Sequence, residues 1–161
     1  MYKHIVSTLV ILLMGSASLY ATSPNTPPIS MDEKVVMLTL LAEAQGEGSN
    51  GMKAVALVIQ QRVVEGKGKT TAARVCRKRL QFSCWNGKTL VQFEKEVMAA
   101  STPRTRQTAL LIAQDVVKRG WTLDRSTIGY ANHYCTTDIT PYWAIGKKPV
   151  AVIRGHKFFR L

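Results

Sequence analysis

Hydrophobic positions recur at helical spacing along most of the chain and give way to short apolar runs near its C-terminus. Two strongly apolar segments, residues 31–45 and 52–64, predict helices. The second is apolar nearly all round, which predicts the central buried helix. Residues 46–51 between them are rich in glycine and predict a loop, with Ser49 or Asn50 capping the second helix. The inward stripe of the first helix is predicted to contain Val35, Val36, Leu38, Thr39 and Ala42.

Shorter helices are predicted at residues 70–76 and 91–100, and a longer one begins at Thr102-Pro103. Further on, apolar runs at residues 150–153 and 156–159 flank Arg154-Gly155 and predict a β-hairpin. Because the helices come first and the strands last, we predict an α+β fold, a mostly helical domain with a small C-terminal β-hairpin or sheet.

The first residues have the features of an export signal. A polar start precedes an apolar core at residues 5–14, and small residues follow, so that cleavage after Ser18 or Ala21 is expected. This core is about ten residues long, and a membrane span needs roughly 20. We therefore assign residues 1–21 to a signal peptide, 22–30 to a flexible linker and 31–161 to one domain. The mature protein is expected in the periplasm, cell wall or extracellular space, without a stable membrane anchor.

The net charge is +12, which favours a polyanionic partner. Aromatic residues do not alternate with the basic ones as they do on a single-strand binding platform. No nucleic-acid partner is therefore expected, and an anionic wall polymer fits an exported protein better. The alternative is that the charge serves solubility alone.

Three cysteines, Cys76, Cys84 and Cys135, allow one disulfide and one leftover thiol in an oxidising compartment. A Cys76–Cys84 bond would close a short basic loop, and a Cys84–Cys135 bond would join distant segments. We favour the local pair.

Glu43 is the first candidate for chemistry. It stands in the last predicted turn of the first helix, among Leu40, Leu41, Ala42 and Ala44. Apolar surroundings disfavour a charged carboxylate, so this group can hold a proton near neutral pH and act as a general acid. The alternative is an ordinary helix-end charge facing solvent.

Aromatic and polar residues mix in the tail, at residues 128–134 and 141–144. Aromatic faces stack on sugar rings, while Asn, His and Tyr side chains form hydrogen bonds with hydroxyls and amides, so this mixture suits a carbohydrate groove. The alternative is that these aromatics fill a small core.

These segments together resemble the SleB/CwlJ-type cell-wall hydrolase family. The resemblance extends over roughly residues 35–159. It rests on six segments in order: A-E-A-Q-G-E at 42–47, G-x-x-A-V-A-x-V-x-x-Q-R at 51–62, Q-F-S at 81–83, A-N-H-Y at 131–134, P-Y-W-A at 141–144 and I-R-G-H-K-F-F at 153–159. The chain departs from the family pattern at Gln61, where Asn is usual, and at Arg154, which separates Ile from Gly.

The resemblance implies a lysozyme-like α+β fold that acts on peptidoglycan glycan strands between N-acetylmuramic acid and N-acetylglucosamine. It places the general acid at Glu43 and implies lytic transglycosylase activity. We expect no cofactor, no metal and a monomer. The residues expected to bind substrate are Glu47, Gln81, Tyr134, Trp143 and His156. Two alternative roles for Glu47 are to support Glu43 through hydrogen bonds and to hold a loop. The alternative role for His156 is structural, a side chain in the hairpin that is hydrogen-bonded to the backbone.

A hydrolase normally needs a second carboxylate, and the sequence offers none in an equally clear setting. The direction of Glu47 is uncertain after the glycines, and Asp124 and Asp138 lie in polar loops. A transglycosylase needs one carboxylate, so we favour it over a muramidase that uses water.

Three other classes remain open. Cys84 or Cys135 with His133 or His156 would make a thiol endopeptidase that cuts wall peptides. A zinc amidase would use His133, His156 and a carboxylate, but the sequence has no ligand spacing of the HExxH type. A non-catalytic basic module would bind wall polymer with salt-sensitive affinity and release no product.

Overall fold

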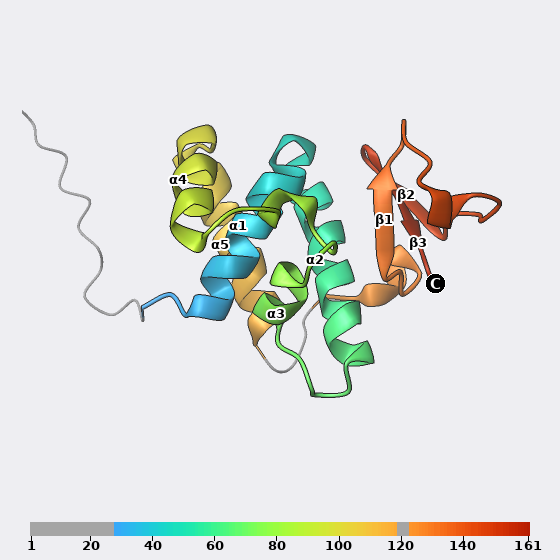
Figure 1. The fold of residues 1–161 in the computed structure, drawn as a ribbon, viewed down its shortest axis with the longest axis horizontal. Coiled ribbons are helices and arrows are strands. Elements are labelled where there is room, and N and C mark those ends of the chain that lie inside the picture. Colours follow the sequence, from blue (N-terminus) through green and yellow to red (C-terminus); the bar gives the residue numbers. More distant parts are fainter. Residues whose placement is uncertain (1–27, 119–122) are drawn as a thin grey trace, which may run out of the picture.

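The computed structural model describes residues 28–118 and 123–161, so the predicted signal peptide and most of the predicted linker lie outside the described residues. It is a mostly helical α+β domain with a three-stranded antiparallel sheet at its C-terminal end, which confirms the predicted fold class (Figure 1). Short 3-10 turns connect several elements. The main elements are α1 (Met31–Ala44), α2 (Gly48–Glu65), α3 (Ala72–Arg77), α4 (Leu90–Ala100), α5 (Pro103–Val117), β1 (His133–Thr136), β2 (Ala151–Ile153) and β3 (His156–Phe159).

Helix α1 lies at the centre of the helical part and contacts α2, α3, α4 and α5. It starts at a capping box in which the Ser30 hydroxyl accepts from the Glu33 N–H and the Glu33 carboxylate accepts from the Ser30 N–H. Because α1 is surrounded, it buries residues on every side, from Val35 to Leu41 without interruption. The predicted stripe was wrong at Ala42, which is exposed.

Helix α2 begins earlier than predicted, at Gly48, and Gln45–Glu47 forms a single 3-10 turn. The expected loop at residues 46–51 was therefore wrong, and so were Ser49 and Asn50 as caps, because both lie inside the helix. The prediction of a buried second helix is confirmed: one face of α2 packs on the other helices, and the opposite face packs on Ile128, Ala131 and Phe158 of the C-terminal part.

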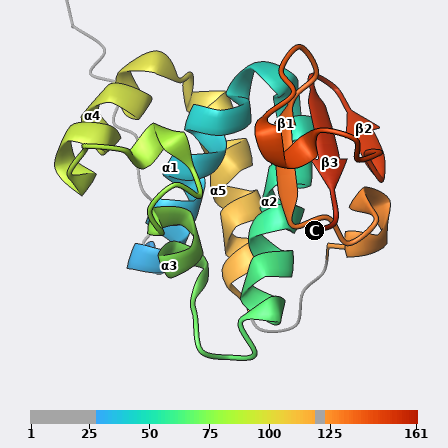
Figure 2. The same ribbon diagram turned by 45° about the vertical axis from the view of Figure 1, so that its right-hand side comes forward.

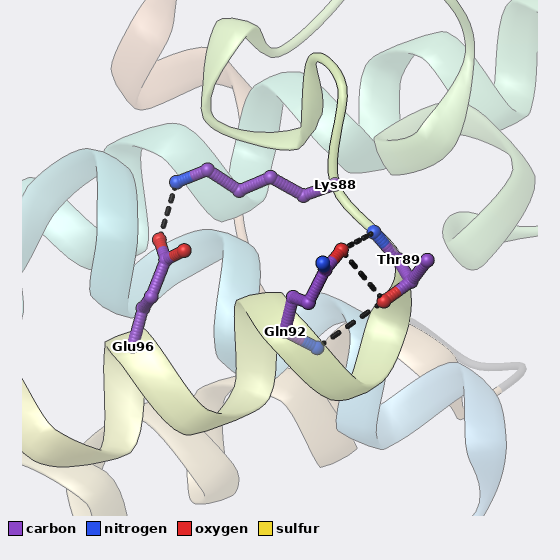
Figure 3. Close-up of polar contacts among 4 residues, drawn as sticks. All are labelled: Lys88, Thr89, Gln92 and Glu96. Carbon is purple, nitrogen blue, oxygen red and sulfur yellow. Dashed lines mark hydrogen bonds and ion pairs between the residues drawn. The ribbon is translucent and has the colours of Figure 1, made fainter.

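The other three predicted helices are confirmed, each with a threonine at its N-cap. Thr71 caps α3, Thr89 caps α4 and Thr102 caps α5. Figure 3 shows the start of α4, where the side chains of Thr89 and Gln92 form a capping box and Lys88 pairs with Glu96 in the next turn.

The predicted hairpin is confirmed as β2 and β3, with β3 in the middle of the strand order β1-β3-β2. Strand β1 was not predicted. It pairs with β3 in the register His133↔Phe159 and Tyr134↔Phe158. Figures 1 and 2 show the sheet beside α2, with α4 at the opposite end of the molecule. The sheet therefore lies against α2, which contacts β2 and packs on Phe158 of β3.

The structure also bears on the cysteines and on membrane insertion. The three cysteines are unbonded, so the favoured Cys76–Cys84 pairing is absent, and Cys76 is buried in the core.

Within residues 28–118 and 123–161, no helix is long and apolar enough to cross a membrane.

Candidate active site

A cleft of about 740 Å³ separates the end of α1 from the sheet. Its walls come from α1, α2, the segment before α4, strand β1, the segment after it and the start of β3. The lining residues are Ala42, Glu43, Arg62, Leu80, Gln81, Ser83, Cys84, His133, Tyr134, Cys135, Thr136, Ile139, Pro141, Trp143 and His156. Glu43 is the one acidic side chain among them.

Glu43 is half-buried in the last turn of α1, and its Oε2 accepts a hydrogen bond of 2.7 Å from the Tyr134 hydroxyl. Burial, together with the neighbouring Glu43 carboxylate, raises the pKa of Tyr134 well above its usual value. Tyr134 therefore stays protonated and remains a donor to Glu43. The contact joins residues 91 positions apart and holds the carboxylate against β1.

Aromatic packing fixes the ring of Tyr134. The Phe158 ring stacks on it with centroids 5.9 Å apart, and the His156 ring meets it edge-on at 5.3 Å. Phe82 lies on another side, with its centroid at 6.3 Å. These rings come from several elements and pack around Tyr134. Their packing holds its hydroxyl in place to donate to Glu43.

A buried anchor places the segment before α4 along the cleft. Trp85 donates its indole N–H to the hydroxyl of Thr39 at 2.9 Å, and its ring centroid lies 4.1 Å from that of Phe93. Thr39 in turn donates to the Val35 carbonyl in α1. This anchor brings Cys84, the residue before Trp85, next to Glu43.

Of the predicted substrate-binding residues, Gln81, Tyr134, Trp143 and His156 line the cleft with Glu43. His156 is buried, and its Nδ1 has no hydrogen-bond partner among the described residues. The ring of Trp143 packs against His133, at 5.3 Å between centroids. The structure thus brings together residues from both halves of the chain.

Glu47 does not line this cleft. Its Oε2 accepts a hydrogen bond of 2.8 Å from the backbone N–H of Gly155, in the turn of the β2–β3 hairpin. Of the three roles considered for Glu47, this position favours holding a loop. Substrate binding by Glu47 stays a prediction that this contact does not support.

Arg62 lines the cleft without having been predicted as a site residue, and His133, which was named only for the alternative enzyme classes, lines it as well. Arg62 donates from Nε to the Asn132 carbonyl at 2.6 Å, and its guanidinium lies 5.2 Å from the Phe82 ring centroid. Its Nη1 is buried without a hydrogen-bond partner in the described part of the chain. In the sequence, Arg62 stands at the polar end of an apolar helix. That pattern predicts only where the helix ends and does not identify a site residue.

Cys84, one of the two cysteines that line the cleft, is poorly suited to act as a nucleophile. Burial first, and then the adjacent Glu43 carboxylate, raise the pKa of Cys84 far above its usual value. Burial also raises the pKa of Cys76, to about 12. Burial also raises the pKa of Cys135, the other cysteine that lines the cleft. All three cysteines are therefore thiols at neutral pH, which opposes the thiol endopeptidase alternative. Nowhere in the described ranges do three His, Cys, Asp or Glu side chains gather as a metal site would require.

We predict that the folded protein contains three free thiols of unequal reactivity. At pH 8, iodoacetamide should label Cys135 first, because Cys84 is held as a thiol and Cys76 is buried. Mass spectrometry of tryptic peptides over time measures the three rates, and unfolding in urea should make them similar. Fast labelling of Cys84 in the folded protein would contradict the prediction and would favour the thiol endopeptidase alternative.

Comparison with known proteins gives one family match. The model of the family described as Cell Wall Hydrolase matches residues 46–159, a span that begins just after Glu43 and includes most of the cleft. No curated protein and no solved structure gives a significant match. Because the matched span exceeds half of the chain, the protein belongs to the Cell Wall Hydrolase family, and this membership indicates a wall-associated or exported enzyme that degrades peptidoglycan.

Proposed function

We propose that the protein is a lytic transglycosylase that cleaves peptidoglycan between N-acetylmuramic acid and N-acetylglucosamine, with Glu43 as its general acid and base. The observation that carries the proposal is that Glu43 is the one carboxylate among the residues lining the cleft. Hydrolysis normally uses two carboxylates about 5–10 Å apart, one of them to act as nucleophile or to activate water. A single carboxylate is sufficient when the nucleophile belongs to the substrate.

The proposed reaction is balanced without water. Glu43 donates its proton to the glycosidic oxygen, and the bond from the muramic acid C1 to that oxygen breaks. The C6 hydroxyl of the same sugar attacks C1 and forms a 1,6-anhydro ring. Its proton passes to the Glu43 carboxylate, which returns to the starting state. Tyr134 keeps one carboxylate oxygen in place during both transfers, through its hydrogen bond to Oε2.

The rest of the cleft is proposed to bind the glycan strand. The half-buried ring of Trp143 lines the cleft and offers a surface for a sugar ring, and Gln81 and His156 offer hydrogen-bonding groups in the same cleft as Glu43. His156 enters this proposal because it lines the cleft next to Tyr134, the residue that donates to Glu43. The enzyme is proposed to act as a monomer without a cofactor, outside the cytoplasm.

Product analysis tests the proposal. Purified peptidoglycan is digested with the mature protein, and the soluble fragments are identified by mass spectrometry. We expect anhydromuropeptides, which are 18 Da lighter than the hydrated products of a muramidase because one water is missing. Digestion in H₂¹⁸O should leave these fragments unlabelled.

Other products would contradict the proposal in different ways. Reducing ends that carry ¹⁸O would show a muramidase. Free stem peptides would show an amidase or endopeptidase. Binding to the wall without any fragment release, with an affinity that falls as salt rises, would show a non-catalytic basic module.

A further inference from the structure

A second cavity of about 430 Å³ adjoins the cleft and shares three lining residues with it, Arg62, Gln81 and His133. Its far wall is formed by the end of α2 and by the segment after α3, which contributes Lys78. The two spaces therefore meet at these three residues, and the second cavity lies next to any group that binds beside them in the cleft.

Arg62 brings an incompletely satisfied cation to the boundary. Its Nε is used by the Asn132 carbonyl, but its buried Nη1 has no hydrogen-bond partner, and the guanidinium makes no ion pair with any described carboxylate. Burial lowers the pKa of Arg62, although arginine keeps its charge at neutral pH. The Nη1 atom itself is buried, but the Arg62 side chain lines the second cavity and brings its positive charge to that space.

The one carboxylate lining the second cavity does not fill this role. Glu65 accepts hydrogen bonds from the Asn132 Nδ2 at 3.1 Å and from the Gln61 Nε2 at 3.0 Å. Across the cavity, Lys78 is exposed and forms no ion pair within the described part of the chain. The positively charged Arg62 and Lys78 thus line a cavity in which the carboxylate of Glu65 is already hydrogen-bonded by the neutral amides of Asn132 and Gln61. This arrangement favours an anionic ligand with oxygen acceptors.

We propose that the second cavity binds the stem peptide carried by the muramoyl residue in the cleft, with a peptide carboxylate between Arg62 and Lys78. The inference rests on the proposed action on peptidoglycan. A carboxylate on a muramoyl residue has two sources: the stem peptide, or the lactyl group that is exposed when the peptide has been removed. The cavity volume favours the peptide, because a lone carboxylate would leave most of about 430 Å³ unfilled.

Binding measurements test this without depending on bond cleavage. Isothermal titration calorimetry compares three soluble ligands: the disaccharide N-acetylglucosamine–N-acetylmuramic acid with its stem peptide, the same disaccharide without the peptide, and a chitin disaccharide without any carboxylate. The peptide-bearing ligand is expected to bind about tenfold more tightly than the other two, which corresponds to about 1.4 kcal/mol.

Two variants test whether the tighter binding of the peptide-bearing ligand comes from the second cavity. Lys78→Ala changes an exposed side chain and should preserve the fold, while Arg62→Gln removes the cation at the boundary. Each should remove most of the peptide-dependent gain. Lys78→Ala, which lies outside the cleft, should also leave binding of the chitin disaccharide unchanged. Lys95→Ala, an exposed lysine on α4 at the far end of the molecule, is the matched charge control and should bind as the wild type does.

Several outcomes would overturn the inference. Equal affinity for the two muramoyl ligands, both above the chitin disaccharide, would assign the site to the lactyl carboxylate. Equal affinity for all three would show no anion site. A peptide-dependent gain that survives Lys78→Ala would place the peptide elsewhere, even if Arg62→Gln fails to fold. Anhydro products in the digest together with any of these results would leave the proposed reaction intact.

Discussion

Replacing Glu43 with Gln is expected to lower the rate of peptidoglycan cleavage by about 10²- to 10⁴-fold, the usual contribution of general acid catalysis. The amide keeps the size of the side chain and can still accept from the Tyr134 hydroxyl, but it cannot donate and regain a proton. The measurement is the initial rate of fragment release from purified peptidoglycan, with circular dichroism and thermal unfolding to confirm that the fold is retained.

Two variants sharpen this experiment. Asp115→Asn, on α5, makes the same carboxylate-to-amide change away from the cleft and should keep wild-type activity. Tyr134→Phe removes only the donor to Glu43 and should lose less activity than Glu43→Gln, because the carboxylate itself remains. If Glu43→Gln retains more than about a tenth of the activity, Glu43 is not the acid that general acid catalysis requires.

The second large effect is expected at Gly51, which packs against Glu47. A β-carbon built on Gly51 would lie 2.1 Å from the Cβ of Glu47, and one built on Gly155 would lie 2.7 Å from its Oε1. Glu47 is therefore held between α2 and the hairpin turn by two residues without side chains. Gly51→Ala should lower the free energy of unfolding by about 1–3 kcal/mol, as overpacking of a tight contact does.

Urea unfolding followed by circular dichroism measures this change. Gly46→Ala is the matched control, because a β-carbon there would meet no atom within 4 Å. We expect Gly46→Ala to stay close to the wild type. Activity should fall with stability in Gly51→Ala, since displaced Glu47 would release the turn that leads directly into His156. Equal unfolding free energies for the two variants would show that the Glu47 contact is not tightly packed.

Local interactions explain what the sequence alone could predict. Helix caps act within about four residues, so Thr71 and Thr102 mark the starts of α3 and α5 in the chain itself. The β2–β3 hairpin is equally local, because its two strands are joined by a turn of two residues. Glu43 was identifiable because its apolar neighbours and the following glycines are adjacent in sequence.

The glycine-rich segment shows where local patterns mislead. Glycine is common in loops, and residues 46–51 contain three, yet α2 already begins at Gly48. Glu47 accepts from the Gly155 N–H, 108 positions later, and only a residue without a side chain fits at Gly51 beside it. The glycine at position 51 therefore serves the packing of Glu47 and does not mark a loop.

The sequence by itself determined the α+β class, most of the helices, the hairpin and the candidate acid, since each depends on neighbours along the chain. Only the tertiary structure decided that Tyr134 donates to Glu43, that β1 pairs with β3 and that Arg62 stands between two cavities. These contacts join segments about 20 to 90 positions apart, and their geometry comes from core packing, which no local pattern encodes.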